Sequence, residues 1–294
     1  MNDRKIGLIG TGIMGEPMGR NLIKAGFELS VFTRTKSKAD GLLAEGAHWC
    51  DSPADVASRA EILISIVSDS PDVEAVYLGR DGVCERLRSG SLCIDMSTVS
   101  PDMARTVDQA LRERGGGFLD APVSGGGNGA KAGTLAIMVG GAAENVERAR
   151  PVFEAVGKSV VHCGPVGHGQ LTKLCNQILC GLNLLAVSEA MVFARKVGLS
   201  PETMLEAVST GAAGSWALNN LGTRMLVRDF APMFMIDLQQ KDLKIALDTA
   251  RHGTIPLPGT SLVHQLLAAN QAAGEGRLGT QALLKTLERL ASLE

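Results

Sequence analysis

A glycine-rich turn at residues 10–15 constrains the fold of this 294-residue chain more than any other feature. The preceding residues 6–9 form an apolar, strand-like run, and a helical pattern follows over 17–24. A G-x-G-x-x-G spacing at such a junction is typical of dinucleotide binding, because the glycines permit a tight bend and the helix start offers free N–H groups to phosphates. The alternative is an ordinary glycine-rich turn. The predicted cofactor-binding residues of the turn are Gly10, Thr11, Gly12, Ile13, Met14 and Gly15.

The first half of the chain alternates short apolar runs with helical segments. This alternation predicts a parallel sheet covered by crossover helices. The predicted strands are residues 5–9, 28–32, 62–66, 91–95, 117–120, 134–139 and 159–162.

Beyond Cys163 the pattern becomes helical. One long, mostly apolar segment covers 169–198, and Ser200-Pro201 is typical of a helix start. Further helices are predicted at 237–251, 261–273 and 280–293. We therefore predict an α/β protein, with a doubly wound Rossmann sheet in residues 1–164 and an all-α domain for substrate binding and dimerisation in residues 165–294.

Composition points to a small-molecule partner. Charged residues make up 20% of the chain and the formal net charge is -2, so no global field favours nucleic acid or an anionic membrane. There is no signal-peptide pattern at the start, and no uninterrupted apolar stretch of the ~18 to 20 residues needed for a membrane span. The five histidines show no metal-ligand spacing, so no metal is predicted. The six cysteines are scattered and predict reduced, buried thiols in a cytoplasmic protein; they are Cys50, Cys84, Cys93, Cys163, Cys175 and Cys180.

The end of the second predicted strand favours NADP over NAD. An NAD enzyme usually places an acidic residue there, on the ribose 2′-OH. This chain has Thr33, Arg34 and Thr35 instead, with Lys36 and Lys38 close behind. Hydroxyl and cationic groups suit a 2′-phosphate. The alternative is a solvated basic loop.

A polar helical face at the start of the long apolar segment is the strongest candidate for catalysis. Gln170, Lys173, Asn176 and Gln177 fall at i, i+3, i+6 and i+7, on one side of the predicted helix. Burial disfavours the charged form of a lysine, which suits a general acid acting on a carbonyl oxygen. The alternative is that this face meets solvent.

A second candidate site follows the strand that ends at Asp120. Ser124, with the N–H groups of Gly125 and Gly126, is placed to bind a carboxylate at the carboxyl end of the sheet. The alternative is a flexible glycine-rich loop. On the predicted helix 237–251, Asp237 with Lys241 and Lys244 with Asp248 have the spacing of i,i+4 charge pairs, which by itself indicates a solvated face.

Together these motifs resemble the β-hydroxyacid dehydrogenase family, which includes the 3-hydroxyisobutyrate dehydrogenases, over nearly the whole chain. The segments that carry the resemblance are the glycine turn continuing through 17–22, Asp95-Met96-Ser97-Thr98, residues 120–126, the Lys173 helix and Lys241-Asp242-Leu243. Within the family, Asn176-Gln177 and residues 186–190, 213–215 and 228–230 are most similar to the tartronate semialdehyde reductases. Gly127-Asn128-Gly129 departs from the glutamate-led segment common at that place.

The resemblance implies a role for each candidate residue. Lys173 is the catalytic lysine, Asn176 helps to hold the substrate, and Ser124, Gly125 and Gly126 bind its carboxylate. The residues implied to contact the cofactor are Val67, Ser68, Thr98 and Lys241.

The implied activity is reduction of tartronate semialdehyde to glycerate by NADPH, or by NADH. A relative acting on 3-hydroxyisobutyrate, succinic semialdehyde or glyoxylate is the alternative. A non-catalytic dinucleotide-binding protein of this fold is a further alternative, which loss of Lys173 or Ser124 would have marked. The long apolar helix predicts a homodimer or homotetramer.

Overall fold

The computed structural model describes residues 4–293, which form two compact units. The first unit ends at Lys173 and the second begins at Leu174. This division falls inside helix α9 (His168–Lys196), because the first turn of α9 is hydrogen-bonded to Asp120 in the sheet of the first unit. The boundary predicted between residues 164 and 165 lies just before this helix.

Strands β1 to β6 run parallel and form a Rossmann sheet. In the order β3-β2-β1-β4-β5-β6, successive strands are added on one side of β1 up to β3 and then on its other side from β4 onward. Ligands bind at such a switch point between β1 and β4 in sheets of this kind. The two-residue β3 was not predicted, because so short a strand leaves no apolar pattern. The bounds are β1 Lys5–Ile9, β2 Glu28–Phe32, β3 His48–Trp49, β4 Ile62–Ser65, β5 Leu92–Asp95 and β6 Gly117–Asp120.

The far side of the sheet departs from the predicted parallel arrangement. β8 (Leu135–Gly141) runs antiparallel to β6 and to the short β7 (Val123–Ser124), and β9 (Gly157–Gly164) then pairs parallel with β8. A parallel return needs a crossover of a dozen or more residues, usually a helix. The only helix between β6 and β8 is the seven-residue α7 (Gly126–Ala132), so the chain turns back instead.

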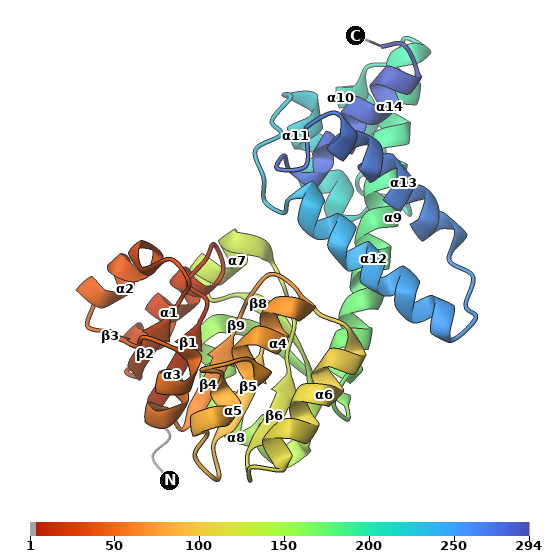
Figure 1. Cartoon of the computed structure of the whole chain (residues 1–294). Coiled ribbons are helices and arrows are strands. Elements are labelled where there is room, and N and C mark those ends of the chain that lie inside the picture. The colour runs from red at the N-terminus through yellow and green to blue at the C-terminus, as the bar shows by residue number, and fades with distance from the viewer. Residues whose placement is uncertain (1–3, 294) are drawn as a thin grey trace. The chain divides into compact units, whose positions relative to one another are not determined.

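Helices cover both faces of this sheet (Figure 1). Leu8 and Ile9 are neighbours on β1 but enter different apolar clusters, because successive strand side chains point to opposite faces. Phe153 belongs to the first cluster and Tyr77 to the second. The remaining elements of this unit are α1 Gly15–Lys24, η1 Lys36–Ala39, α2 Asp40–Ala44, α3 Pro53–Arg59, α4 Ser70–Leu78, α5 Val83–Arg86, α6 Pro101–Arg112 and α8 Ala143–Val156.

The second unit is helical, as predicted. Ser200 caps α10 by accepting a hydrogen bond from the N–H of Thr203 at 3.1 Å, with Pro201 at the first helical position. Met191, Leu243 and Leu267 are among the buried residues of its core. After α9, its elements are α10 Pro201–Val208, the π-helical η2 Ala217–Gly222, α11 Thr223–Leu226, α12 Ile236–His252, α13 Pro258–Ala272, η3 Thr280–Ala282 and α14 Leu283–Leu290.

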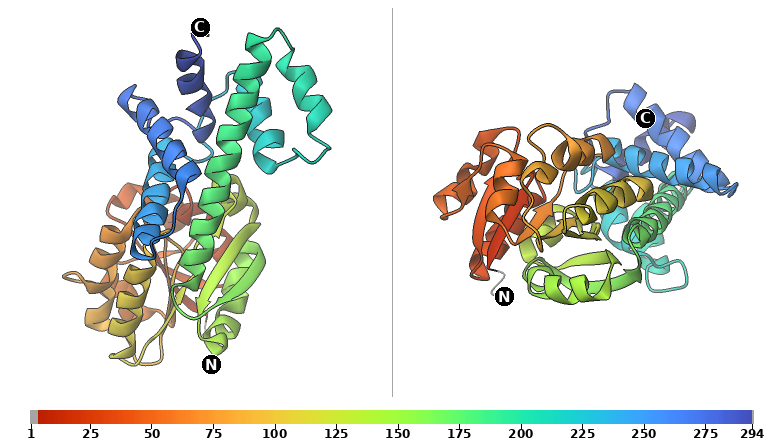
Figure 2. Two further views of the ribbon diagram at one scale, coloured as in Figure 1. Left: turned by 90° about the vertical axis from the view of Figure 1, so that its right-hand side faces the viewer. Right: turned by 60° about the horizontal axis from the view of Figure 1, so that its bottom comes forward.

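Helix α9 is the longest element and runs without a break (Figure 2). Within residues 4–293 it is the one helix long and apolar enough to cross a membrane by length and composition, with a mean hydropathy of 1.6 over its most apolar window. Core helices of globular proteins meet the same criterion. Leu184 and Met191 on α9 belong to the core of the helical unit.

The cysteine prediction was partly wrong. None of the six cysteines forms a disulfide, but only Cys50 and Cys93 are buried, whereas Cys175 and Cys180 are exposed. The last two lie on positions of α9 that face away from the helical core, which the apolar character of the segment did not reveal.

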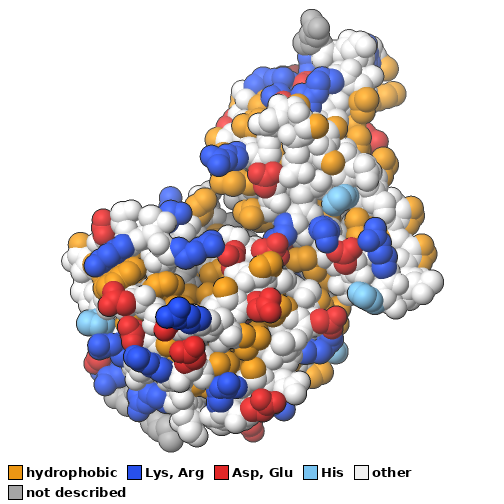
Figure 3. All heavy atoms as spheres, viewed as in Figure 1, with side chains coloured by type: hydrophobic (Ala, Val, Ile, Leu, Met, Phe, Trp, Pro, Cys, Tyr) orange, Lys and Arg blue, Asp and Glu red, His pale blue; other side chains and the backbone are white. Residues whose placement is uncertain are grey.

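On the face drawn in Figure 3, basic and acidic side chains are interspersed over the Rossmann unit.

Candidate active site

The glycine turn between β1 and α1 has the close packing that its sequence predicts. Gly10 has φ +97°, and a Cβ there would lie 2.2 Å from the carbonyl oxygen of Ile66. A Cβ on Gly15 would lie 1.9 Å from the carbonyl oxygen of Gly10. Around Gly12, by contrast, a Cβ would meet nothing within 4 Å. The turn is therefore tight at both ends and open at Gly12, where a phosphate can approach the backbone.

The residues around this opening suit a phosphate group. No side chain caps the start of α1 at Met14. The Glu16 N–H donates to the Gly12 carbonyl at 3.0 Å and Pro17 has no N–H, so the backbone N–H groups of Met14 and Gly15 are the ones in the first turn without a partner within the described residues. Thr11 Oγ1 is buried and has no hydrogen-bond partner within the described residues. Ile13 is 67% exposed beside it. These features fit the diphosphate of a dinucleotide cofactor.

The basic segment after β2 lies at the surface and contains a contact that the sequence did not reveal. The Arg34 guanidinium forms an ion pair with Asp72 Oδ1 of α4 at 2.9 Å, and its side chain is 79% exposed. Lys36 Nζ stacks over the Trp49 ring, whereas Thr35 and Lys38 are exposed. Half-buried Thr33 lies directly after β2. Arg34 therefore lies just beyond β2 with a carboxylate beside it, and its contact with a cofactor stays a prediction.

A buried polar network supports the predicted cofactor residues beyond β4 and β5. Asp95 Oδ1 accepts hydrogen bonds from Ser65 and Ser97 hydroxyls, each at 2.7 Å. Ser97 Oγ in turn accepts from the Val67 N–H at 2.9 Å. Ser65 also bonds the Tyr77 hydroxyl at 2.8 Å, and burial raises the pKa of Tyr77. Asp95 thus fixes the loops that carry the predicted Val67, Ser68 and Thr98.

The Ser124 segment connects a short strand to a short helix. Ser124 ends β7, Gly125 has φ +134° and Gly126 has φ +60°, a succession of positive φ angles that favours glycine. Gly127-Asn128-Gly129 lies within α7. A Cβ on Gly127 would lie 3.2 Å from Cγ2 of Ile13, so this segment lies against the glycine turn.

Asp120 fixes the start of α9 to the sheet. Its Oδ1 accepts the Gly167 N–H at 2.7 Å, and its Oδ2 accepts the Gln170 N–H at 2.8 Å. Burial raises the pKa of Asp120 to about 6, although these two hydrogen bonds act in the opposite direction. This role was missed at the sequence level because the partners lie 47 and 50 residues away. An acidic residue ending an apolar strand was the available signal.

Gln170 joins the lysine helix to the predicted cofactor segment. Its Nε2 donates to the Ser97 carbonyl at 2.9 Å, and its Oε1 accepts the Val99 N–H at 3.1 Å. The carboxamide therefore holds the backbone on both sides of Thr98. Lys173, one turn further along α9, is only 6% exposed. The polar helical face is thus buried at Gln170 and Lys173.

The remaining candidates, Asn176 and Lys241, belong to the helical unit. Asn176 is half-buried on α9. Lys241 on α12 forms an ion pair with Asp242 Oδ1 at 2.9 Å, whereas Asp237 accepts a hydrogen bond from Gln271 at 2.6 Å. Lys241 and Asp237 thus each have a partner other than one another, and the Asp237–Lys241 pair predicted from spacing stays a prediction. The predicted Lys244–Asp248 pair is confirmed at 2.6 Å.

His168 begins α9, with Nδ1 3.3 Å from the Cys163 carbonyl oxygen. Within residues 4–293, no group of three or more His, Cys, Asp or Glu side chains is arranged to hold a metal ion.

Comparison with known proteins agrees with this geometry. Residues 5–164 match the NAD-binding domain of 6-phosphogluconate dehydrogenase, and residues 167–287 match the NAD-binding domain of NADP-dependent 3-hydroxyisobutyrate dehydrogenase. The chain is 42% identical to 2-hydroxy-3-oxopropionate reductase of Escherichia coli, over 98% of both chains. The chain belongs to the β-hydroxyacid dehydrogenase family. It is an NAD(P)-dependent oxidoreductase.

Two further matches name L-serine. NAD-dependent L-serine dehydrogenase of Pseudomonas aeruginosa is 40% identical, over 90% of this chain and 91% of its own. A structure of 3-hydroxyisobutyrate dehydrogenase of Mycobacterium tuberculosis with L-serine has a TM-score of 0.90 and 33% identity, over 97% of this chain and 99% of that one. The comparisons therefore agree on family and fold but differ on substrate.

Proposed function

We propose that this protein reduces tartronate semialdehyde (2-hydroxy-3-oxopropanoate) to glycerate, reversibly, with NADPH as the preferred donor and NADH as the alternative. The observation that carries the proposal is the burial of Lys173. One turn earlier on the same helix, Gln170 hydrogen-bonds the backbone on both sides of Thr98. The identity to 2-hydroxy-3-oxopropionate reductase over almost the full chain supports the choice of substrate.

When bound, the nicotinamide cofactor would supply the hydride for the aldehyde carbon. Lys173 donates a proton to the carbonyl oxygen as that oxygen becomes an alcohol, and accepts it in the reverse direction. Ser124 and the backbone at Gly125 and Gly126 hold the carboxylate of the substrate. Asn176, one turn beyond Lys173 on α9, orients the substrate by hydrogen bonding.

A panel of substrates with both cofactors tests the proposal. Purified protein is assayed in the reductive direction with tartronate semialdehyde, succinic semialdehyde and glyoxylate, and in the oxidative direction with glycerate, 3-hydroxyisobutyrate and L-serine. We expect the highest kcat/KM for the tartronate semialdehyde and glycerate pair. A higher kcat/KM for any other substrate would refute the proposed substrate.

Oxidation of L-serine is the second candidate function. It is favoured by the Pseudomonas aeruginosa enzyme and by the Mycobacterium tuberculosis structure with L-serine. L-serine and glycerate differ only in an amino or hydroxyl group at C2. A hydrophobic pocket discriminates weakly between such groups, but a site built to hydrogen-bond one of them discriminates strongly.

We further propose that the protein acts in the cytoplasm as a homodimer or homotetramer, without nucleic-acid or membrane partners. The six free thiols are in keeping with a reducing compartment. Leu179 and Phe193 on α9 are 61% and 66% exposed, an apolar surface that a second copy would cover. Light scattering after size exclusion tests the assembly: a monomer at micromolar concentration would contradict it.

A further inference from the structure

A chain of hydrogen bonds within the helical unit leads to Asn176. Asn176 Nδ2 donates to Gln177 Oε1 at 2.7 Å, and Gln177 Nε2 donates to Asp242 Oδ2 at 2.6 Å. The other carboxylate oxygen, Asp242 Oδ1, faces Lys241 Nζ at 2.9 Å. Gln177 is 3% exposed and Asp242 is 1% exposed, so the chain is shielded from water between its two ends.

Gln239 holds the middle of this chain in place. Its Oε1 accepts from Gln177 Nε2 at 3.4 Å, and its Nε2 donates to the Gln177 carbonyl at 3.3 Å. Both contacts run between α12 and α9. The Gln177 amide nitrogen therefore donates to both Asp242 and Gln239, and its Oε1 accepts from Asn176.

The direction of the chain follows from the carboxylate at its buried end. An ionised carboxylate only accepts hydrogen bonds, whereas a carboxamide has a donor and an acceptor end. Asp242 thus requires the nitrogen of Gln177, which leaves the Gln177 oxygen facing Asn176. That oxygen in turn requires the nitrogen of Asn176. Both described hydrogen bonds of the Asn176 side chain, to Gln177 and to Cys180, use Nδ2.

We propose that Asp242 and Gln177 are positioning residues that make Asn176 present its Oδ1, an acceptor, to the substrate. The inference rests on the proposed function, which places Asn176 at the substrate. A substrate with a donor opposite Asn176, such as a hydroxyl group, satisfies this acceptor. A substrate with a methyl group at that place leaves it without a hydrogen bond, which disfavours binding.

The central test is Asp242→Asn, which keeps the size of the side chain but removes the requirement for a donor. The new carboxamide can donate to Gln177 Oε1, so that the direction of the whole chain can reverse. We expect kcat/KM to fall about tenfold, the effect of one misdirected hydrogen bond. The matched control is Asp248→Asn on the same helix, where the carboxylate pairs with Lys244 and Arg251 at the surface. It should leave kcat/KM unchanged.

A double-mutant cycle with Asn176→Ala separates positioning from a general structural role. If Asp242 acts through Asn176, the tenfold loss appears with Asn176 present and disappears in the Asn176→Ala background. Equal losses in both backgrounds would overturn the proposal. Thermal melting of each variant reports folding separately from the kinetic constants.

Two substitutions of Gln177 provide an independent test. In Gln177→Glu the buried glutamic acid, sharing a proton with Asp242, donates to that carboxylate and still accepts from Asn176. Gln177→Met keeps similar volume but removes both bonds. We expect Gln177→Glu to retain most of the kcat/KM that Gln177→Met loses; equal loss in the two variants would overturn the proposal.

These assays distinguish the inference from the proposed function. The cycle is run on whichever hydroxy acid or aldehyde acid the unmodified protein turns over fastest in the substrate panel. Failure with tartronate semialdehyde then refutes the proposed substrate only. Additive losses in the cycle refute the positioning role whatever the substrate.

Discussion

Lys173 is only 6% exposed and lies one turn beyond Gln170 on α9. The Gln170 side chain hydrogen-bonds the backbone on both sides of Thr98. Changing Lys173→Ala removes the proposed proton donor without touching the glycine turn. We expect kcat to fall by about 10² to 10⁴, the usual contribution of general acid–base catalysis. Binding of NADPH, followed by fluorescence titration, should remain nearly unchanged. Full turnover in the variant would exclude Lys173 as the proton donor.

Arg34 is the residue on which the proposed preference for NADPH over NADH depends. Arg34→Asp replaces a cation by a carboxylate beside the existing Asp72, and a 2′-phosphate would then face two like charges. The Kd for NADPH should rise by at least about tenfold, the value of one charge-assisted hydrogen bond, with a smaller change for NADH. Lys158→Asp on β9 is a control for the change of net charge. An unaltered NADPH to NADH ratio would mean that the segment is solvated surface.

At the scale of elements, α9 depends on Asp120 at its start. The pKa of Asp120 lies at about 6 in the fold, above the ordinary 3.8, because burial disfavours the ionised form. The folded state therefore binds the extra proton between pH 4 and pH 6, and this group makes the protein less stable as the pH rises through that range.

The measurement is the free energy of unfolding in urea for the unmodified protein and for Asp120→Asn. The advantage of the unmodified protein should be larger at pH 4 than at pH 7 by about 2 kcal/mol, from the pKa difference. In addition, the amide substitution removes one of two acceptors for backbone N–H groups, which costs about 1 to 3 kcal/mol. If the stability advantage of the unmodified protein instead grew as the pH rises, the hydrogen bonds to Asp120 would lower its pKa more than burial raises it.

Prediction from sequence succeeded where the signal is local. The strands β1, β2 and β6 have the predicted bounds, because an apolar run between turn residues identifies a buried strand. The reversed direction of β8 was missed, because strand direction depends on the connection and not on the apolar pattern. The Arg34–Asp72 pair joins residues 38 positions apart, and spacing cannot reveal such a contact.

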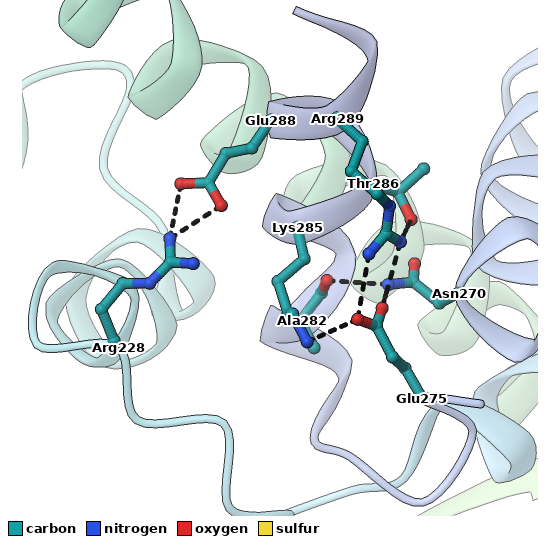
Figure 4. Close-up of polar contacts among 8 residues, drawn as sticks. All are labelled: Arg228, Asn270, Glu275, Ala282, Lys285, Thr286, Glu288 and Arg289. Atoms are coloured by element: carbon teal, nitrogen blue, oxygen red, sulfur yellow. Dashed lines mark hydrogen bonds and ion pairs between the residues drawn. The ribbon is translucent and has the colours of Figure 1, made fainter. Parts of the chain in front are cut away.

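At the scale of the whole molecule, a buried ionic cluster stabilises the end of the helical unit (Figure 4). Glu275 accepts hydrogen bonds from Arg289 at 3.0 and 3.1 Å and from Asn270 at 2.6 Å, and it also pairs with Lys285. Burial alone would raise the pKa of Glu275, but these partners outweigh it and lower the pKa to about 2. In the same region Glu288 accepts from Arg228 at 2.5 and 2.7 Å.

A depressed pKa makes this cluster a source of acid sensitivity. Glu275 contributes stability above its ordinary pKa of 4.5, and that stability is lost as the pH falls toward about 2. Glu275→Gln should lower the free energy of unfolding at pH 7 by about 1 to 2 kcal/mol, allowing for screening by solvent. The difference should shrink progressively below pH 4.5. Glu206→Gln, at an exposed position of α10, is the control; an equal loss there would remove the special role of Glu275.

The hydrogen-bond chain from Asp242 through Gln177 to Asn176 has an evolutionary consequence. In the proposed role, Asp242 acts through Gln177 to set which atom of Asn176 faces the substrate. One nucleotide change, from an aspartate to an asparagine codon, would therefore be enough to invert what the site offers. A lineage of such enzymes can thus shift between donor-bearing and acceptor-bearing substrates while every residue that contacts the substrate stays the same.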